Sequence, residues 1–413
     1  MKSMNKNYKY SFIFNFLILL NYFFWIINIE LIRKFIIFFI FVIIIAYLTL
    51  DSIKKNFPEK LFIVTALFVG LSSVDNDWDG RYIWLFHAKR ILIDNSIYSQ
   101  LDNYLPFTHN DYPNLIPALS ASLGNFFGYI NYSALKLSNV IILLGPIIFI
   151  CSFINSDLKK IVFLTLFLWI TQKTFLSGSV DDALAAYSLA SSIIIFLFFL
   201  NEEEKNFSII QFLSFLYLIS LTLIKNEGLV ILLCLIIVGI LMKIILIKKK
   251  IKIKNLLILA LLFIPIFQWK WMCINSNIYS EIATLENFNY LKNRFFDLRS
   301  YWNIFNFTVL NVSIILPLIL FFIFIPKKIN LKIFNNLKIL SIKNNYDNAK
   351  LFFFVSTCLL YYCALFIIYL STPYDLYWHL TTSAYRTMMP IGLIIAFYSI
   401  FDPEKKNYLF KRS

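Results

Sequence analysis

Three aspartates at alternate positions, Asp75, Asp77 and Asp79, stand where an apolar segment gives way to a long polar insert. Carboxylates in such a place can act as a general base, hold a metal ion or accept a hydrogen bond from a substrate. Their spacing alone does not choose among these roles. The choice depends on the elements that position them and on the other reactive groups nearby.

The composition indicates a membrane protein. The 413-residue chain is 60% hydrophobic and 15% charged, with a mean hydropathy of +0.73, and a soluble protein of this length cannot hide so much apolar surface. The net charge of +15 does not point to nucleic acid, because the lysines lie in connectors between apolar runs, where orientation signals belong. The five cysteines show no paired spacing, which argues against a disulfide framework or a zinc site.

The repeated apolar runs predict an all-α polytopic membrane protein with about twelve transmembrane helices. A two-span segment, 1–60, precedes a transmembrane domain over 61–401 and a cytoplasmic tail over 402–413. The first outer loop, 75–135, is large, and its stretch 80–94 has the character of an interfacial helix with a polar and an apolar side. The expected spans are 11–28, 35–50, 61–74, 136–154, 161–177, 183–200, 208–224, 228–247, 255–272, 304–325, 351–370 and 387–401.

The charges of the connectors predict an orientation. Most Lys and Arg residues fall on one side of this topology, which predicts that both termini are cytoplasmic. Arg33 and Lys34 do not fit, because they would lie outside. Most acidic residues and all three histidines fall on the outer side. Acidic residues contribute little to orientation, so their excess there indicates a site that faces away from the cytoplasm.

The outer segments contain further residues with chemical potential. Charged side chains at membrane depth are costly and therefore point to function, and an arginine at the lipid boundary suits a phosphate. The residues singled out beside the aspartates are Arg81, His109, Tyr112, Asp181, Asp182, Lys225, Glu227, His379 and Arg386.

Each of these segments also has a purely structural interpretation. One of the two acids at 181–182 can cap the helix that they begin, and 225–228 can be an interfacial turn whose side chains reach water. His109 can bond to its own loop backbone. The aromatic stretch 373–386 is also typical of an interface belt, and 80–94 of an anchor with solvated charges.

Taken in order, five short motifs resemble those of the GT-C glycosyltransferases, membrane enzymes that use lipid-linked sugars. The resemblance covers about 61–400 and is nearest to the bacterial protein O-mannosyltransferase and lipid A aminoarabinose transferase families. It departs from them where Asp79-Gly80 replaces the usual Asp-Glu pair and where the lysine of a Lys-Pro-Pro-Leu motif is missing. The motifs stand here as Asp79 to Trp84, Asp111-Tyr112-Pro113, Asp181-Asp182-Ala183-Leu184-Ala185, Lys225-Asn226-Glu227-Gly228 and Arg386 to Pro390.

The resemblance implies roles for these residues. Asp79 is the expected base, with Asp77 as the alternative, and Lys225, Arg386 and Arg81 are expected to bind phosphate. The other residues expected to contact substrate are Asp181, Asp182, Glu227, His109, Tyr112 and His379. The outer Asp and His residues can supply ligands for a divalent metal ion, although no spacing requires one.

These observations predict an enzyme of the bacterial cytoplasmic membrane. It would transfer a sugar from a polyprenyl-phosphate donor to a glycan, lipid or protein acceptor at the outer face, with the inversion at the anomeric carbon that the resemblance implies. A transporter or flippase of a lipid-linked sugar is the alternative, but it should have charges near the bilayer midplane and an internal repeat, which the sequence does not show. A non-catalytic membrane subunit of envelope polysaccharide assembly is the third candidate.

Overall fold

The protein is helical wherever its structure, a computed structural model, is described. The described residues are 6–49, 56–72, 76–97, 108–130, 132–172, 174–175, 177–200, 209–247, 253–278, 285–324 and 342–400, and no strand occurs among them. The predicted all-α class is therefore confirmed for this part of the chain. Asp75 and the expected tail 402–413 lie outside the described residues.

The helices follow the apolar runs of the sequence, because a backbone in lipid must satisfy its own hydrogen bonds. Their bounds are α1 (Lys6–Ile26), α2 (Glu30–Thr49), α3 (Phe57–Gly70), η1 (Gly80–Trp84), α4 (Leu85–Asp94), α5 (Leu115–Phe127), α6 (Tyr132–Ser152), α7 (Asp157–Thr171), α8 (Asp181–Leu200), α9 (Ile209–Ile224), α10 (Asn226–Ile245), α11 (Ile253–Leu261), α12 (Ile264–Asn275), α13 (Leu285–Phe295), α14 (Leu298–Val309), α15 (Val312–Phe324), α16 (Ile342–Ser371), α17 (Leu376–Thr387) and α18 (Met389–Ile400).

Seven helical segments in the described part of the chain are long and apolar enough to cross a membrane. They lie in α1, α2, α6, α8, α10, the α11–α12 stretch and α16, and a bent pair in α14 and α15, with an angle of 73°, allows an eighth. The chain is therefore a polytopic helical membrane protein. The other expected spans coincide with shorter helices, such as the 14 residues of α3, so the number twelve stays a prediction.

Two helices form the centre of the bundle. In the most apolar part of α6 every residue is buried, and in that part of α8 94% of the residues are buried. In the corresponding part of α2 only 33% of the residues are buried. α1 packs against α6 and α9, and α2 packs against α1 and α5. The two N-terminal helices, which the sequence sets apart as 1–60, thus pack directly on the helices that follow.

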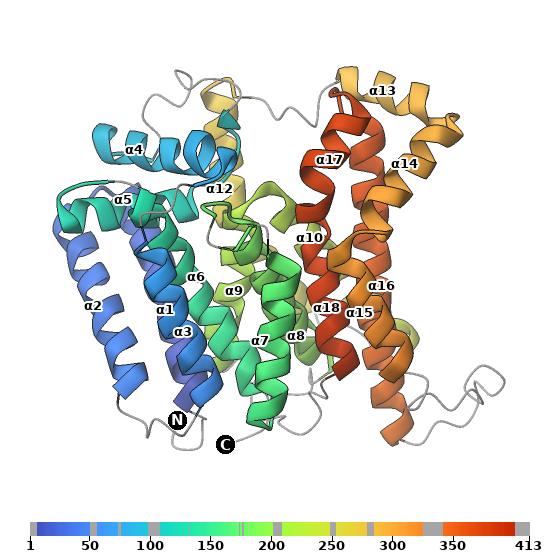
Figure 1. Ribbon diagram of the computed structural model, residues 1–413, viewed down its shortest axis with the longest axis horizontal. Coiled ribbons are helices and arrows are strands. Elements are labelled where there is room, and N and C mark those ends of the chain that lie inside the picture. The colour runs from blue at the N-terminus through green and yellow to red at the C-terminus, as the bar shows by residue number, and fades with distance from the viewer. Residues whose placement is uncertain are drawn as a thin grey trace.

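The helices η1 and α4 of the polar insert lie at one end of the bundle, together with α13 and α17 (Figure 1). η1 and α4 form the helix that was predicted over 80–94, and this helix packs against α5. Its buried side mixes Leu85, Ala88 and Ile91 with His87, whose Nδ1 lies 3.0 Å from the amide oxygen of Asn114. Asn114, in the loop before α5, therefore supplies a polar partner for the histidine on this side of the helix.

Arg33, which did not fit the predicted orientation, has a structural role. Its buried guanidinium lies 3.7 Å from the ring centroid of Trp25 and donates to the side-chain oxygens of Asn28 and Asn95. Asn95 ends α4 in the left-handed conformation, with φ of 50°. Arg33 therefore ties the turn between α1 and α2 to the end of the helix in the polar insert.

Candidate functional site

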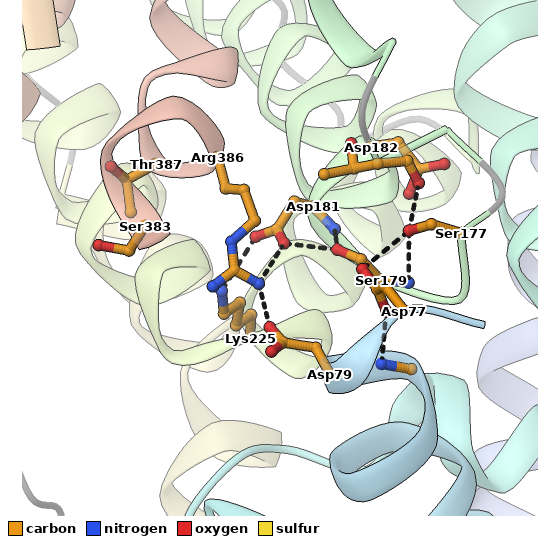
Figure 2. A network of polar contacts seen from close by, with 12 residues as sticks. Asp77, Asp79, Ser177, Ser179, Asp181, Asp182, Lys225, Ser383, Arg386 and Thr387 are labelled. Carbon is orange, nitrogen blue, oxygen red and sulfur yellow. Dashed lines mark hydrogen bonds and ion pairs between the residues drawn. The ribbon is translucent and has the colours of Figure 1, made fainter. Parts of the chain in front are cut away.

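Five charged side chains at the insert end form a row in which the signs alternate; we call them the charge row (Figure 2 shows all but Glu227). Asp79 pairs with Arg386, whose Nη1 lies 3.7 Å from Oδ2 of Asp181. Lys225 Nζ lies 2.9 Å from the other oxygen of Asp181 and 3.2 Å from Oε1 of Glu227. The fold thus brings together residues from four distant segments of the chain.

Helix ends position the charge row. Asp79 directly precedes η1, Asp181 and Glu227 lie in the first turns of α8 and α10, and Arg386 lies in the last turn of α17. Each of these charges is opposite in sign to the helix end beside it, which is favourable. Lys225 is the exception, because a cation just before α10 has the unfavourable sign. Its two carboxylate partners in the row compensate for this.

The turn between α9 and α10 fixes two members of the row. A Cβ atom at Gly228 would lie 2.0 Å from the carbonyl oxygen of Leu221, so α9 and α10 can approach this closely only with glycine there. The turn is so short that Lys225 and Glu227, on either side of Asn226, both reach the site. The prediction that almost no connector separates these two helices is confirmed.

The row is deeply buried in the middle and more open at its ends. The exposed fraction of the side chain is 2% for Asp181 and 7% for Lys225, and it rises to 17% for Glu227 and 20% for both Asp79 and Arg386. A molecule that enters the site therefore meets Asp79, Arg386 and Glu227 before it meets the centre.

The carboxylates keep both cations charged. Burial alone lowers the pKa of the Lys225 ammonium, but the charges of Asp181 and Glu227 more than reverse this and raise the pKa well above its ordinary value. Burial also acts to lower the pKa of the Arg386 guanidinium, and Asp181 and Asp79 raise it above its ordinary value. With all five groups ionised, three carboxylates face two cations, and the row has one excess negative charge.

Asp77 has a different environment from Asp79. Its Oδ1 accepts from the backbone N–H of Gly80 at 2.7 Å, and its Oδ2 accepts from the hydroxyl of Ser177 at 3.0 Å. Burial raises the pKa of this carboxyl group. Asp77 therefore fastens the start of the insert to the turn between α7 and α8. That turn passes very close to the insert, since a Cβ on Gly178 would lie 2.8 Å from Cγ of Asn76.

An aromatic group lies beside the row. The ring of Tyr112 stacks on those of Trp84 and His109, with centroids 5.6 Å and 4.9 Å away. Lys225 Nζ lies 5.6 Å from the centroid of the Tyr112 ring, within the range of a cation–π contact. The structure therefore brings the expected residues His109 and Tyr112 next to the row.

His379, the other expected site residue on α17, lies on the side of the helix that faces α16. Its ring is 5.2 Å from that of Tyr369, and the Tyr369 hydroxyl bonds to Ser383 and Thr387, one and two turns further along α17. Burial, reinforced by the charge of Arg386, lowers the pKa of His379 to about 4. His379 is therefore neutral near pH 7.

Two expected site residues have other contacts. Arg81 donates to the carbonyl oxygen of Asn76 and lies 5.7 Å from the ring centroid of Tyr132. Asp182 is buried, and its Oδ1 accepts from the N–H of Ala183 at 2.8 Å. In the part of the chain that the structure describes, no group of three or more His, Cys, Asp or Glu side chains is arranged to hold a metal ion. The carboxylates of the charge row face cationic side chains instead.

The sequence analysis missed two cations that support the site. Lys270 Nζ donates to Asn226 Oδ1 at 2.8 Å and to the carbonyl oxygen of Asp111 at 3.2 Å, so it joins α12 to the start of α10. Arg294 donates to the carbonyl oxygens of Thr372 and Tyr374, at 2.6 Å and 2.9 Å, in the turn before α17. Lys270 lies within an expected span, where a lone charge is itself a signal of function.

Comparisons with known proteins add no identity to this geometry. No protein-family model, no curated protein and no solved structure matches the chain. The likeness to GT-C glycosyltransferases therefore rests on the motifs alone. The fold and the site define a polytopic helical membrane protein with a partly open, alternating row of charges at one end of its bundle.

Proposed function

We propose that the protein is a glycosyltransferase that moves a sugar from a polyprenyl-phosphate donor to an acceptor hydroxyl. The charge row carries this proposal, because it joins the two things that the reaction needs. One is a carboxylate that can take a proton from the acceptor. The other is a pair of cations, Lys225 and Arg386, that can stabilise a leaving phosphate. A site at one end of a membrane bundle also suits a donor whose lipid tail stays in the bilayer.

The step conserves atoms and charge. The acceptor hydroxyl gives its proton to Asp79, and its oxygen forms a bond to the anomeric carbon of the sugar. The bond from that carbon to the phosphate oxygen breaks, and its electron pair leaves with the polyprenyl phosphate. Attack from the side opposite to the phosphate inverts the anomeric carbon. The cations of the row lower the barrier because they face the charge that develops on the phosphate.

Asp79 suits the role of base better than Asp77 does. Both oxygens of Asp77 accept hydrogen bonds, from Gly80 and Ser177, that hold the insert in place. Asp79 has an exposed fraction of 20% and contacts the guanidinium of Arg386, which Asp181 also holds. Its carboxylate can therefore be released to a substrate without loss of the local fold.

The location of the row does not favour a transporter. A transport pathway places its charges near the bilayer midplane, between two related halves. Asp181 and Glu227 lie instead in the first turns of their helices, and Arg386 lies in the last turn of α17.

The test is a comparison of envelope glycans, glycolipids and glycoproteins by mass spectrometry. We expect a strain that lacks the chain to lose a sugar-bearing species, and Asp79→Asn to lower its formation by about 10²- to 10⁴-fold. The matched control is Asp297→Asn, because Asp297 caps α14 and asparagine caps equally well. Full recovery by Asp79→Asn at normal protein levels would remove Asp79 from this role. An unchanged profile in the deletion strain would refute the function.

A further inference from the structure

The charge row has no unused positive charge for a donor phosphate. Lys225 contacts both Asp181 and Glu227, and Arg386 contacts both Asp79 and Asp181. A phosphate would bring further negative charge to a row that already has one in excess. Like charges at such short range repel one another by several kcal/mol in a poorly solvated site. One of the carboxylates must therefore leave its cation when the phosphate binds.

We propose that the donor phosphate displaces Asp79 from Arg386, so that the same event forms the phosphate site and releases the base. This inference rests on the proposed function. It means that the donor must bind before Asp79 can accept a proton from the acceptor. While the donor is absent, the carboxylate of Asp79 is held by the guanidinium of Arg386.

Asp79 is the carboxylate that can leave. Asp181 has an exposed fraction of 2%, and besides Arg386 it bonds to Lys225 at 2.9 Å and to the Ser179 hydroxyl at 2.6 Å. Among the described residues, the side chain of Asp79 bonds to Arg386, and its exposed fraction is ten times larger. Removing Asp181 from the row takes away one of the two carboxylate partners of both Lys225 and Arg386, whereas moving Asp79 affects Arg386 alone and turns a carboxylate towards water.

Arg386 can receive the phosphate at the same place. Its Nε–H is buried and has no hydrogen-bond partner within the described part of the chain, while its Nη1 is bonded to Asp79. A guanidinium binds phosphate best through two parallel N–H groups. The contact with Asp79 uses Nη1, whereas a phosphate in its place would use the parallel N–H groups of Nη1 and Nη2.

Binding of decaprenyl phosphate to the full chain in phosphatidylcholine nanodiscs tests the proposal. We expect Asp79→Asn to bind this lipid about tenfold more tightly than the wild type, because the competing carboxylate is gone. The matched control is Asp297→Asn, which removes the same charge at the start of α14, where asparagine caps the helix equally well. We expect it to change the affinity by less than about twofold, since its charge is not in the row. Binding of decaprenol, which has no phosphate, measures the contribution of the lipid tail to the affinity.

The outcomes separate this proposal from the proposed function. Equal or weaker binding by Asp79→Asn, with binding by the wild type intact, would overturn the displacement and leave the function standing. Absence of binding by both proteins would overturn both. Asp79→Ser provides a second uncharged variant, and thermal unfolding in the nanodiscs verifies that each variant is folded. An equal tightening for inorganic phosphate would support displacement by the phosphate group itself, and tightening for the lipid alone would support displacement by a membrane-held phosphate.

Discussion

Two groups of buried charges lie at opposite ends of α7, and they are built differently. Near the start of α7, Lys160 pairs with Glu59 at 2.8 Å, and the exposed fractions of the two side chains are 8% and 0%. Lys160 also donates to the amide oxygen of Asn56 at 3.1 Å. Beyond the end of α7, Ser177 leads to Asp181 and the charge row. The first group is a closed pair that joins α3 to α7, although the exposed carboxylate of Asp157 also lies 3.8 Å from Lys160. The second is a longer row whose ends are partly exposed.

The difference shows that buried charge alone does not identify a functional site. A buried ion pair such as Glu59 and Lys160 is compatible with a structural role, because the two charges stabilise each other. The charge row has three carboxylates for two cations, and its ends are more exposed than its centre. The exposed ends, where Asp79 and Arg386 lie, leave a place for a substrate.

The largest expected effect contrasts the centres of the two groups. We expect Asp181→Asn to lower transfer activity by at least about a hundredfold, because Lys225 and Arg386 lose the anion that fixes their positions and a shift of about 1 Å is enough for such a loss. We expect Glu59→Gln to leave the activity per folded molecule nearly unchanged. The measurement is the rate of product formation divided by the amount of folded protein. Equal losses of activity for the two variants would show that the two groups of charges do not differ in function.

A double-mutant cycle on the closed pair should give the next largest effect. Glu59→Gln leaves the buried Lys160 with only the more distant, exposed carboxylate of Asp157 as a charged partner in the described part of the chain, and we expect this to lower the free energy of unfolding by about 3 kcal/mol. Adding Lys160→Met should restore most of that loss, because an apolar side chain of similar length replaces the stranded ammonium. Unfolding in nanodiscs measures all four proteins. A double variant as unstable as the single one would show that the pair is more than a mutual contact.

The sequence was sufficient to predict the residues at helix ends. Asp181, Lys225 and Arg386 stand at boundaries of apolar runs, where charge is expensive and hence noticeable, and the structure brings all three together. Asp77 and Asp79, two residues apart, were not separable by their spacing. Their difference comes from Ser177 and Arg386, which approach from remote parts of the chain.

The supporting cations were beyond the reach of sequence patterns. Lys270 meets Asp111 across 159 residues, and Arg294 meets Thr372 across 78. Such partners depend on how the helices pack, which no local periodicity records. The same reason explains Arg33, which did not fit the predicted orientation: its partner, Asn95, is 62 residues away.

Acid sensitivity should belong to the insert end. Burial lowers the pKa of His87 from 6.5 to about 4. The charge of His109 also lowers this pKa, and the contacts with Asn114 and Asp111 act in the opposite direction. A lowered pKa means that the native state resists protonation. The neutral His87 side chain therefore contributes fully to stability above pH 6.5. This contribution is lost as the pH falls from 6.5 through 4, by about 3 kcal/mol in all. We expect His87→Asn, which can keep the contact with Asn114, to flatten the loss of thermal stability between pH 6.5 and 4. A slope equal to that of the wild type would assign the sensitivity to other groups.

The smallest expected effect concerns two cations that bond to backbone carbonyls at opposite ends. Arg294 donates to Thr372 and Tyr374 beside the helix that carries Arg386, whereas Lys243 donates to the carbonyl oxygen of Phe199 near the end of α8. We expect Arg294→Lys to lose one of its two short bonds, at a cost of about 1 kcal/mol. Because the loss lies in the turn that orients α17, it should raise the KM for the donor about fivefold with little change in kcat.

Lys243→Met is the comparison at the other end, and we expect it to change stability and leave KM unaltered. A shift of KM in both variants would mean that the insert end is no more sensitive to such a loss than the rest of the bundle.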